Sequence, residues 1–229
     1  MNVEYSIMMA MNEESKKNII FRPAEFSKDV VRIVKLWHDV YQETHAHLVP
    51  KELMKYRTME QFRIRVENPE FVIRTIVAIN LSNSRQEDAE QLMGFITTRT
   101  ENYEIYQLFV AKDARGSGIA KELLRQAEEY LKTYENNKTN CGQLSDVSSE
   151  QKDKKHVIIH LYASIGNCAA KRFYENNGWK TVKEEIFQAE VVRNERKNSE
   201  PQDKLSNTSP KITYFPVPCY RLEKLLYLK

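Results

Sequence analysis

Two glycines stand one residue apart just before a segment of strong helical periodicity, in the stretch ARGSGIAKELL from Ala114 to Leu124. The residues before it, EIYQLFV from Glu104 to Val110, are β-branched and aromatic, and they predict a strand whose alternate side chains point to opposite faces. A glycine turn that opens a helix presents unpaired N–H groups and the positive end of the helix dipole. The spacing therefore predicts a phosphate-binding turn between a strand and a helix.

Details of the turn separate the families that bind phosphate in this way. A Walker loop needs a Gly-Lys-Ser/Thr ending and a dinucleotide fold needs Gly-x-Gly-x-x-Gly, and the stretch has neither pattern. Arg115, Gly118 and Ala120 instead form Arg-x-x-Gly-x-Ala. This resembles the signature with which the GNAT superfamily of N-acetyltransferases holds the pyrophosphate of acetyl-CoA. An ordinary tight turn is the alternative reading of so short a pattern.

A second motif lies downstream, after a strand predicted over His156–Tyr162. The residues from Asn167 to Trp179 resemble the family pattern Asn-x-x-Ala-x-x-Phe-Tyr-x-x-x-Gly-Phe/Trp, with Phe173 before a tyrosine and Gly178 as the helix C-cap. Two motifs in the family's order identify the chain as a member of the GNAT superfamily.

The resemblance implies two catalytic residues. Glu104 precedes Arg115 by eleven residues, the spacing at which histone-modifying members carry their glutamate base. A base or a water relay is needed because an alkyl amine, with a pKa of about 10, is mostly protonated at neutral pH. Tyr174 corresponds to the tyrosine that faces the coenzyme A sulfur and gives a proton to the departing thiolate. The alternative for Glu104 is a surface carboxylate without a catalytic role, and the alternative for Tyr174 is an aromatic residue that only packs.

The resemblance also implies a cofactor site without metal. The backbone near Phe109 or Val110 is expected to pair with the pantetheine amides and to bind the oxyanion. Asn167 would contact the pantetheine arm, although a simple helix N-cap is the alternative. The full set of expected cofactor-binding residues is Phe109, Val110, Arg115, Gly116, Ser117, Gly118, Ile119, Ala120 and Asn167.

The acceptor site is expected along the first two helices and their loop, as in the family. The expected substrate residues are Trp37, Tyr41, His45, His47 and Arg57. Two histidines without a third ligand are weak support for a metal. Four arginines could receive a phosphate or carboxylate, although such residues are usually a solvated face: Arg57, Arg63, Arg65 and Arg74.

These observations predict an acetyl-CoA-dependent N-acetyltransferase that moves an acetyl group to a primary amine by direct transfer in a ternary complex. A small-molecule acceptor is favoured, anionic examples being an amino-sugar phosphate such as glucosamine 6-phosphate or an amino acid. Two alternatives stay open: a protein lysine or N-terminal acetyltransferase, and a non-catalytic acetyl-CoA-binding regulatory module. The presence of Glu104, Asn167 and Tyr174 together argues against the non-catalytic module.

Composition sets the remaining expectations. The chain has 229 residues and a net charge of only +3, which does not call for nucleic acid or a membrane surface as a partner. Its three cysteines are widely spaced, as expected for reduced thiols in the cytoplasm, with the nucleus as an alternative. Its start lacks an apolar signal core. A monomer or homodimer is expected.

The remaining segments predict the other helices and strands of the domain. Val30, Ile33, Val34, Trp37, Val40 and Tyr41 form a helical stripe behind a cap at Ser27. Pro50 opens a short helix, and Thr58 begins a capping box for another that ends at Asn68-Pro69. The other expected strands are Ile19–Pro23, Phe71–Leu81, Leu92–Thr98, Thr181–Phe187 and one near Tyr214–Leu222.

The fold class is therefore α/β (α+β), with the GNAT fold: a central, mixed, mostly antiparallel twisted sheet of about six to seven strands flanked by about four helices. Residues 1–18 are expected to be a flexible leader before a single N-acetyltransferase domain over 19–229. Segments that are polar and rich in Asn, Ser and Lys predict insertions at about 133–155 and 194–210.

Overall fold

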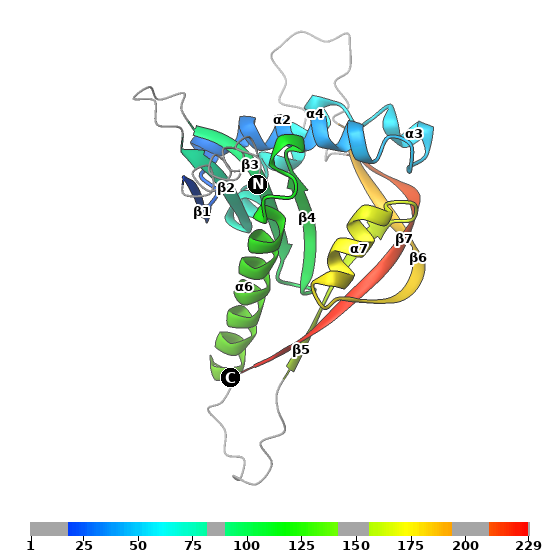
Figure 1. Ribbon diagram of the computed structural model, residues 1–229. Helices are drawn as coiled ribbons and strands as arrows, with labels where there is room; N and C mark the ends of the chain where they lie inside the picture. The colour runs from blue at the N-terminus through cyan, green and yellow to red at the C-terminus, as the bar shows by residue number, and fades with distance from the viewer. Residues whose placement is uncertain (1–17, 82–89, 142–155, 194–210, 229) are drawn as a thin grey trace, which may run out of the picture.

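One twisted sheet of seven strands organises the part of the chain that the computed structural model describes, which is residues 18–81, 90–141, 156–193 and 211–228. The strand order is β1-β2-β3-β4-β5-β7-β6, and Figure 1 shows the long hairpin of β6 and β7 at one edge. The elements are β1 (Ile19–Pro23), α2 (Phe26–Thr44), α3 (Lys51–Met54), α4 (Met59–Val66), α5 (Pro69–Ile73), β2 (Thr75–Leu81), β3 (Glu90–Arg99), β4 (Glu104–Val110), the 3-10 helix η2 (Lys112–Ala114), α6 (Ile119–Cys141), β5 (His156–Ser164), α7 (Cys168–Asn176), β6 (Lys180–Arg193) and β7 (Lys211–Tyr227).

The predicted fold class is confirmed. Within the described residues, every pair of neighbouring strands is antiparallel except β4 and β5. Six α-helices are present there instead of about four, and two of them, α3 and α5, have only four and five residues. None of the described helices is long and apolar enough to cross a membrane.

Helices cover both faces of the sheet. On one face α2, α4 and α5 pack against Val77, Ile79 and Phe95. On the other face α6 and α7 pack against Ala78 and Ile96, which alternate with the first set along β2 and β3, and against Leu161 of β5. Figure 1 shows α6 and α7 on the viewer's side and the row of α2, α3 and α4 along the top. Each strand therefore contributes side chains to two apolar layers, as period-two alternation requires.

The first helix has the predicted stripe but begins elsewhere than predicted. All six stripe positions are buried. Ser27 does not cap the helix, because the helix begins at Phe26 and Glu25 is the N-cap residue. The Asp29 carboxylate accepts a hydrogen bond from the Glu25 backbone N–H at 2.7 Å and pairs with Arg22 at 2.6 Å. An acidic side chain held at the helix N-terminus thus replaces the predicted serine.

A short helix replaces the predicted start of the second strand. Thr58 caps α4 as predicted, accepting from the Gln61 backbone N–H at 3.4 Å. Asn68 then caps α5 with Pro69 in its first turn, so Phe71 is helical and β2 begins only at Thr75. Asparagine before proline favours a helix start, and that signal outweighs the apolar run that follows.

β4 contains one residue, Tyr106, without a partner on β3, because the register shifts between its neighbours Ile105 and Gln107. An extra residue of this kind is a β-bulge, and it reverses the face to which later side chains point. Glu104 and Phe109, an odd number of residues apart, therefore line the same cavity. The predicted strict alternation along this strand is wrong.

The predicted polar insertions lie mostly outside the described residues, as do residues 1–17 of the predicted leader. One boundary is corrected: α6 continues to Cys141, so the segment predicted as an insertion from residue 133 begins as helix. Residues 133–138 occupy partly or fully exposed positions, where a helix accepts polar side chains. The two strands of the final hairpin are also longer than predicted, at 14 and 17 residues.

Candidate functional site

The glycine turn adopts the backbone that only glycine takes up readily. Gly116 and Gly118 have φ values of 78° and 92°, in the left-handed region. A Cβ at either position would meet no atom within 4 Å, so the turn is open on its outer side. The Ser117 hydroxyl donates to the Ala114 carbonyl at 2.6 Å and braces the turn. Helix α6 begins directly after it, with the Ile119 side chain 3% exposed in the core. The outer side of the turn is therefore unobstructed, as the predicted phosphate-binding turn requires.

Arg115 stands at the mouth of this turn with an acidic neighbour from another element. Its two terminal nitrogens donate to the two carboxylate oxygens of Glu43, on α2, at 3.0 and 2.9 Å. Hydrogen bonding to Arg115 lowers the pKa of Glu43. Both residues are exposed, so this bidentate pair is open to exchange with a stronger anion.

A cavity of about 170 Å³ adjoins the turn. Five of the predicted cofactor residues line it: Phe109, Val110, Arg115, Ala120 and Asn167. Asn167 caps α7, its side-chain oxygen accepting from the Ala170 backbone N–H at 3.1 Å, so the N-cap alternative describes its contact in this structure. Tyr174 lines the same cavity and is 8% exposed. Burial raises the pKa of its phenol, which therefore stays protonated at neutral pH.

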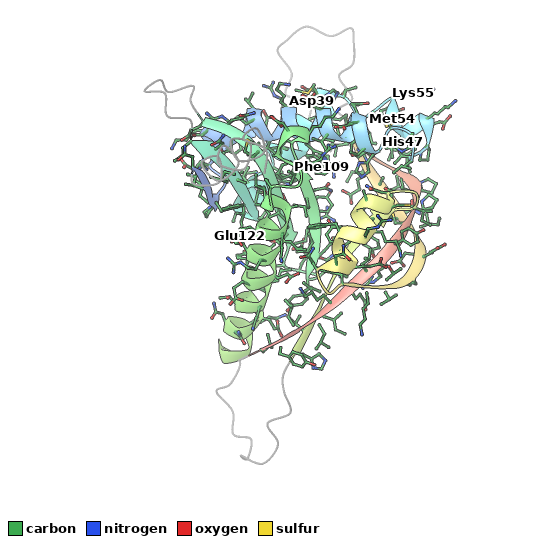
Figure 2. The ribbon with its side chains drawn as sticks, in the orientation of Figure 1. Asp39, His47, Met54, Lys55, Phe109 and Glu122 are labelled. Carbon is green, nitrogen blue, oxygen red and sulfur yellow. The ribbon has the colours of Figure 1, made fainter. Side chains whose placement is uncertain are left out.

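A second cavity, of about 110 Å³, shares His45 and Phe109 with the first. Figure 2 shows Phe109 on β4, below the row of helices α2 to α4. The predicted residues that line this cavity are Trp37, Tyr41, His45, Arg57, Glu104 and Phe109. His45 and Phe109 thus form a partition between the two cavities. Predicted cofactor residues lie on one side of this partition, and most of the predicted acceptor residues lie on the other.

Glu104 is a buried carboxylate in the second cavity. The residue is 3% exposed, and one carboxylate oxygen accepts hydrogen bonds from Asn102 at 3.1 Å and from Arg99 at 3.5 Å. Burial raises the pKa of Glu104 above its ordinary value, although Arg99 and Asn102 act in the opposite direction. A carboxylate with a raised pKa is a better proton acceptor than one on the surface.

The two histidines predicted for the acceptor site lie in different environments. His45 lies between the cavities, stacked on Tyr41 with ring centroids 4.7 Å apart, and its Nδ1 is 2.7 Å from the Thr44 hydroxyl. Burial lowers the pKa of His45 to about 4, so its imidazole is neutral at pH 7. His47 is exposed and lines neither cavity, and Figure 2 places it near α3.

The sheet opens beside this partition. β4 and β5 pair only at Glu104 with His160 and at Ile105 with Leu161, and then separate, as Figure 1 shows. The later residues of β4, including Phe109 and Val110, therefore face the cavities without a neighbouring β5 strand. A ligand with amide groups can pair with an open strand of this kind.

Residues 85–181 match the family model described as an acetyltransferase (GNAT) domain. This match covers less than half of the chain, and it supports the resemblance to the GNAT superfamily that the two motifs predict. The matched model describes an acetyltransferase domain, in agreement with the predicted activity. No curated protein matches the sequence.

Solved structures share the GNAT fold with this chain. The PaiA N-acetyltransferase from Thermoplasma acidophilum, solved in complex with coenzyme A, has 16% identity and a TM-score of 0.52, covering 90% of this chain and 98% of that one. The apo form of YjaB from Escherichia coli has 18% identity and a TM-score of 0.50, with 90% and 96% covered. A GCN5-related N-acetyltransferase from Sphaerobacter thermophilus has 14% identity and a TM-score of 0.50, with 76% and 47% covered.

Sequence reasoning missed part of the lining of the second cavity. The additional residues that line it include Arg99, Tyr106, Gln107, Tyr162, Phe187, Glu190 and Cys219. Tyr106 could have been found, because it lies two residues after the glutamate. The residues of β6 and β7 carry no local signal, since the long hairpin brings them to the site from far along the chain. No group of three or more metal-type ligands lies within the described residues.

Proposed function

We propose that this GNAT protein transfers the acetyl group of acetyl-CoA directly to a primary amine in a ternary complex. The observation that carries the proposal is the meeting of two cavities at His45 and Phe109. One cavity adjoins the glycine turn and Tyr174, and the other contains the buried Glu104 carboxylate. Donor and acceptor can therefore approach from opposite sides of one partition, without a covalent acetyl-enzyme.

The residues on the donor side fit the cosubstrate. The backbone N–H groups from Arg115 to Ala120 would bind the pyrophosphate, and the Arg115 guanidinium would exchange Glu43 for it. The open backbone at Phe109 and Val110 would pair with the pantetheine amides and bind the oxyanion.

Glu104 is the proposed base, directly or through a water. The carboxylate would take a proton from the acceptor ammonium, which leaves a neutral nitrogen to attack the thioester carbonyl carbon. Its raised pKa suits this role because the proton affinity of the base is then closer to the operating pH.

Tyr174 is the proposed proton donor to the leaving sulfur. When the new C–N bond forms and the C–S bond breaks, the departing thiolate needs a proton to become a free thiol. The Tyr174 hydroxyl lies in the donor cavity and is protonated at neutral pH, so it can supply that proton. The attacking nitrogen, which carries one proton more than the amide product, releases that proton to solvent, and the phenolate regains one from solvent after product release.

The proposed acceptor is a small molecule, because the acceptor cavity measures only about 110 Å³. Anionic amines such as glucosamine 6-phosphate and amino acids belong to this class. We also propose a reducing compartment, the cytoplasm or the nucleus, since Cys168 and Cys219 are both free thiols.

Thiol release from acetyl-CoA tests the proposal. The wild-type protein is supplied in turn with small amines, polyamines, lysine-containing peptides and peptides with free N-termini, and acetyl-CoA binding is measured separately. Turnover with a small amine supports the proposal, and turnover confined to peptides would assign a protein acceptor. Tight binding of acetyl-CoA without turnover on any amine would indicate a non-catalytic acetyl-CoA-binding module.

A further inference from the structure

Arg57 brings a positive charge into the interior without a carboxylate to balance it. The residue is 4% exposed, its guanidinium lies 5.6 Å from the centre of the Tyr41 ring, and within the described residues it forms no ion pair with a carboxylate. One guanidinium nitrogen, Nη1, donates to the backbone carbonyl of Glu190 at 3.1 Å. Its Nε is buried without a hydrogen-bond partner in the described part of the chain. A buried cation that is left incompletely bonded in this way is costly unless a ligand completes its bonds.

Arg65 adds a second positive charge to the same cavity. Its guanidinium lies 4.4 Å from the centre of the Trp37 ring, and Nη2 donates to the Tyr106 hydroxyl. Burial and the nearby Arg65 guanidinium both lower the pKa of Arg57. The two like charges therefore repel each other across the cavity, and an anion placed between them would relieve the repulsion.

The neighbouring arginines differ from this pair. Arg63 is paired with Glu67 at 3.3 Å on the exposed side of α4. Arg74 is paired with Glu70 at 2.9 Å and also with Glu101. Within the described residues, neither Arg57 nor Arg65 has such a carboxylate partner. Of the four arginines considered from the sequence, these two are thus available to an anion.

The overall charge of the cavity also favours an anionic ligand. Its lining residues include three arginines, Arg57, Arg65 and Arg99, and two glutamates, Glu104 and Glu190. Arg99 and Glu104 already contact each other. The lining is therefore positive even when both carboxyl groups are ionised, and more positive when Glu104 is protonated.

We propose that the acceptor is a small amine that carries a carboxylate or phosphate group, and that Arg57 and Arg65 bind this group. The inference rests on the proposed function and narrows its substrate class. The amine of the acceptor would then extend toward Glu104 and the Phe109 partition. A cavity of about 110 Å³ fits a small head group, whereas drug-sized ligands need roughly 300–1,000 Å³.

Matched pairs of amines test the inference through thiol release. β-Alanine is compared with β-alanine amide, phosphoethanolamine with ethanolamine, and glucosamine 6-phosphate with glucosamine. The two arms distinguish a carboxylate from a phosphate. Because charged hydrogen bonds are strong, the anionic member of at least one pair should have a kcat/KM about ten- to hundredfold higher than its neutral partner.

Substitutions connect this preference to the two arginines. Arg57→Met and Arg65→Met should each remove most of it, mainly through KM, while Arg63→Met should leave it unchanged. Arg57→Met should also raise the Tm of the protein measured without acceptor, because it removes a buried charge while keeping most of the volume. This readout does not depend on activity.

Several results would overturn the inference. The inference fails if neutral amines react as well as their anionic partners. It also fails if the preference survives in folded Arg57→Met and Arg65→Met, or if a peptide reacts as well as the small anionic amines. A lower Tm for Arg57→Met would show that the protein itself satisfies this charge. If the wild-type protein releases no thiol with any amine, the proposed function fails and the inference with it. Turnover of neutral amines distinguishes the two failures.

Discussion

Arg99→Met removes the positive charge beside the proposed base while keeping most of the side-chain volume over Tyr106, where the guanidinium now lies 3.4 Å from the ring centre. The Arg99 charge favours the ionised form of Glu104, so its loss should raise the pKa of that carboxyl further. The base acts when it is deprotonated. The acid limb of the pH profile for kcat/KM should therefore move to higher pH.

The size of the shift follows from the distance. At 3.5 Å, and with the Arg99 side chain 30% exposed, an effective dielectric constant between about 40 and about 80 gives roughly 1–2.5 kcal/mol of interaction. This corresponds to about one to two pKa units. Arg99→Lys keeps the charge and should leave the limb closer to that of the wild-type protein.

The assay is the initial rate of thiol release at low acceptor concentration, from about pH 5 to about pH 9, a range that covers a raised carboxyl pKa. The acceptor amine also titrates, but its pKa is the same for every variant, so differences between variants belong to the protein. Arg125→Met, which removes a surface cation paired with Glu122 at 2.6 Å, is the matched control. An acid limb that stays in place, or moves to lower pH, in folded Arg99→Met would refute the assignment of Glu104 as the base.

Three further predictions concern the donor side. Gly118→Glu places bulk and negative charge in the turn, at a φ of 92°, and should abolish acetyl-CoA binding, measured by calorimetry; unchanged affinity in the folded variant would remove the basis of the cofactor site. Tyr174→Phe should lower kcat by about ten- to a thousandfold with little change in acetyl-CoA affinity; unaltered turnover would assign the proton donor elsewhere. Glu43→Gln should free Arg115 and tighten acetyl-CoA binding by about two- to fivefold, since the displaced pair is exposed; weaker binding would show that the pair positions Arg115 instead of competing for it.

Much of the fold could be predicted because its signals are local. The stripe from Val30 to Tyr41 repeats with helical spacing, and every member is buried. The strand from Glu104 to Val110 matches the predicted range at both ends. The glycines at 116 and 118 have the positive φ values that their position before a helix suggests. Each of these features depends on a few consecutive residues.

The register of that same strand could not be predicted. Alternation assigns Glu104 and Phe109 to opposite faces, and only the unpaired Tyr106 brings them to one cavity. A bulge is a property of two strands together, because it appears where one strand has a residue more than its partner. A single-strand pattern does not contain that information.

The electrostatics of the acceptor side were similarly out of reach. Arg57, Arg63, Arg65 and Arg74 look alike in the sequence, as basic residues near predicted helices. Their difference lies in whether a carboxylate is nearby: Arg63 and Arg74 have one on their own helix turn. Arg57 and Arg65 face a cavity that β6 and β7 help to enclose. Such pairing depends on contacts between residues far apart in the chain.

On the proposed function, the short parallel contact of β4 with β5 would link the stability of this chain to the cell's supply of acetyl-CoA. Within the described residues, β4 and β5 are not paired beyond Ile105 and Leu161, and the apolar layer under α6 joins the two halves of the sheet instead. A ligand that bridges the opening binds the folded chain and not the unfolded one. At a concentration one hundred times its Kd, such a ligand adds about 2.7 kcal/mol to the free energy of unfolding. The amount of folded protein would then rise and fall with the metabolite that it consumes.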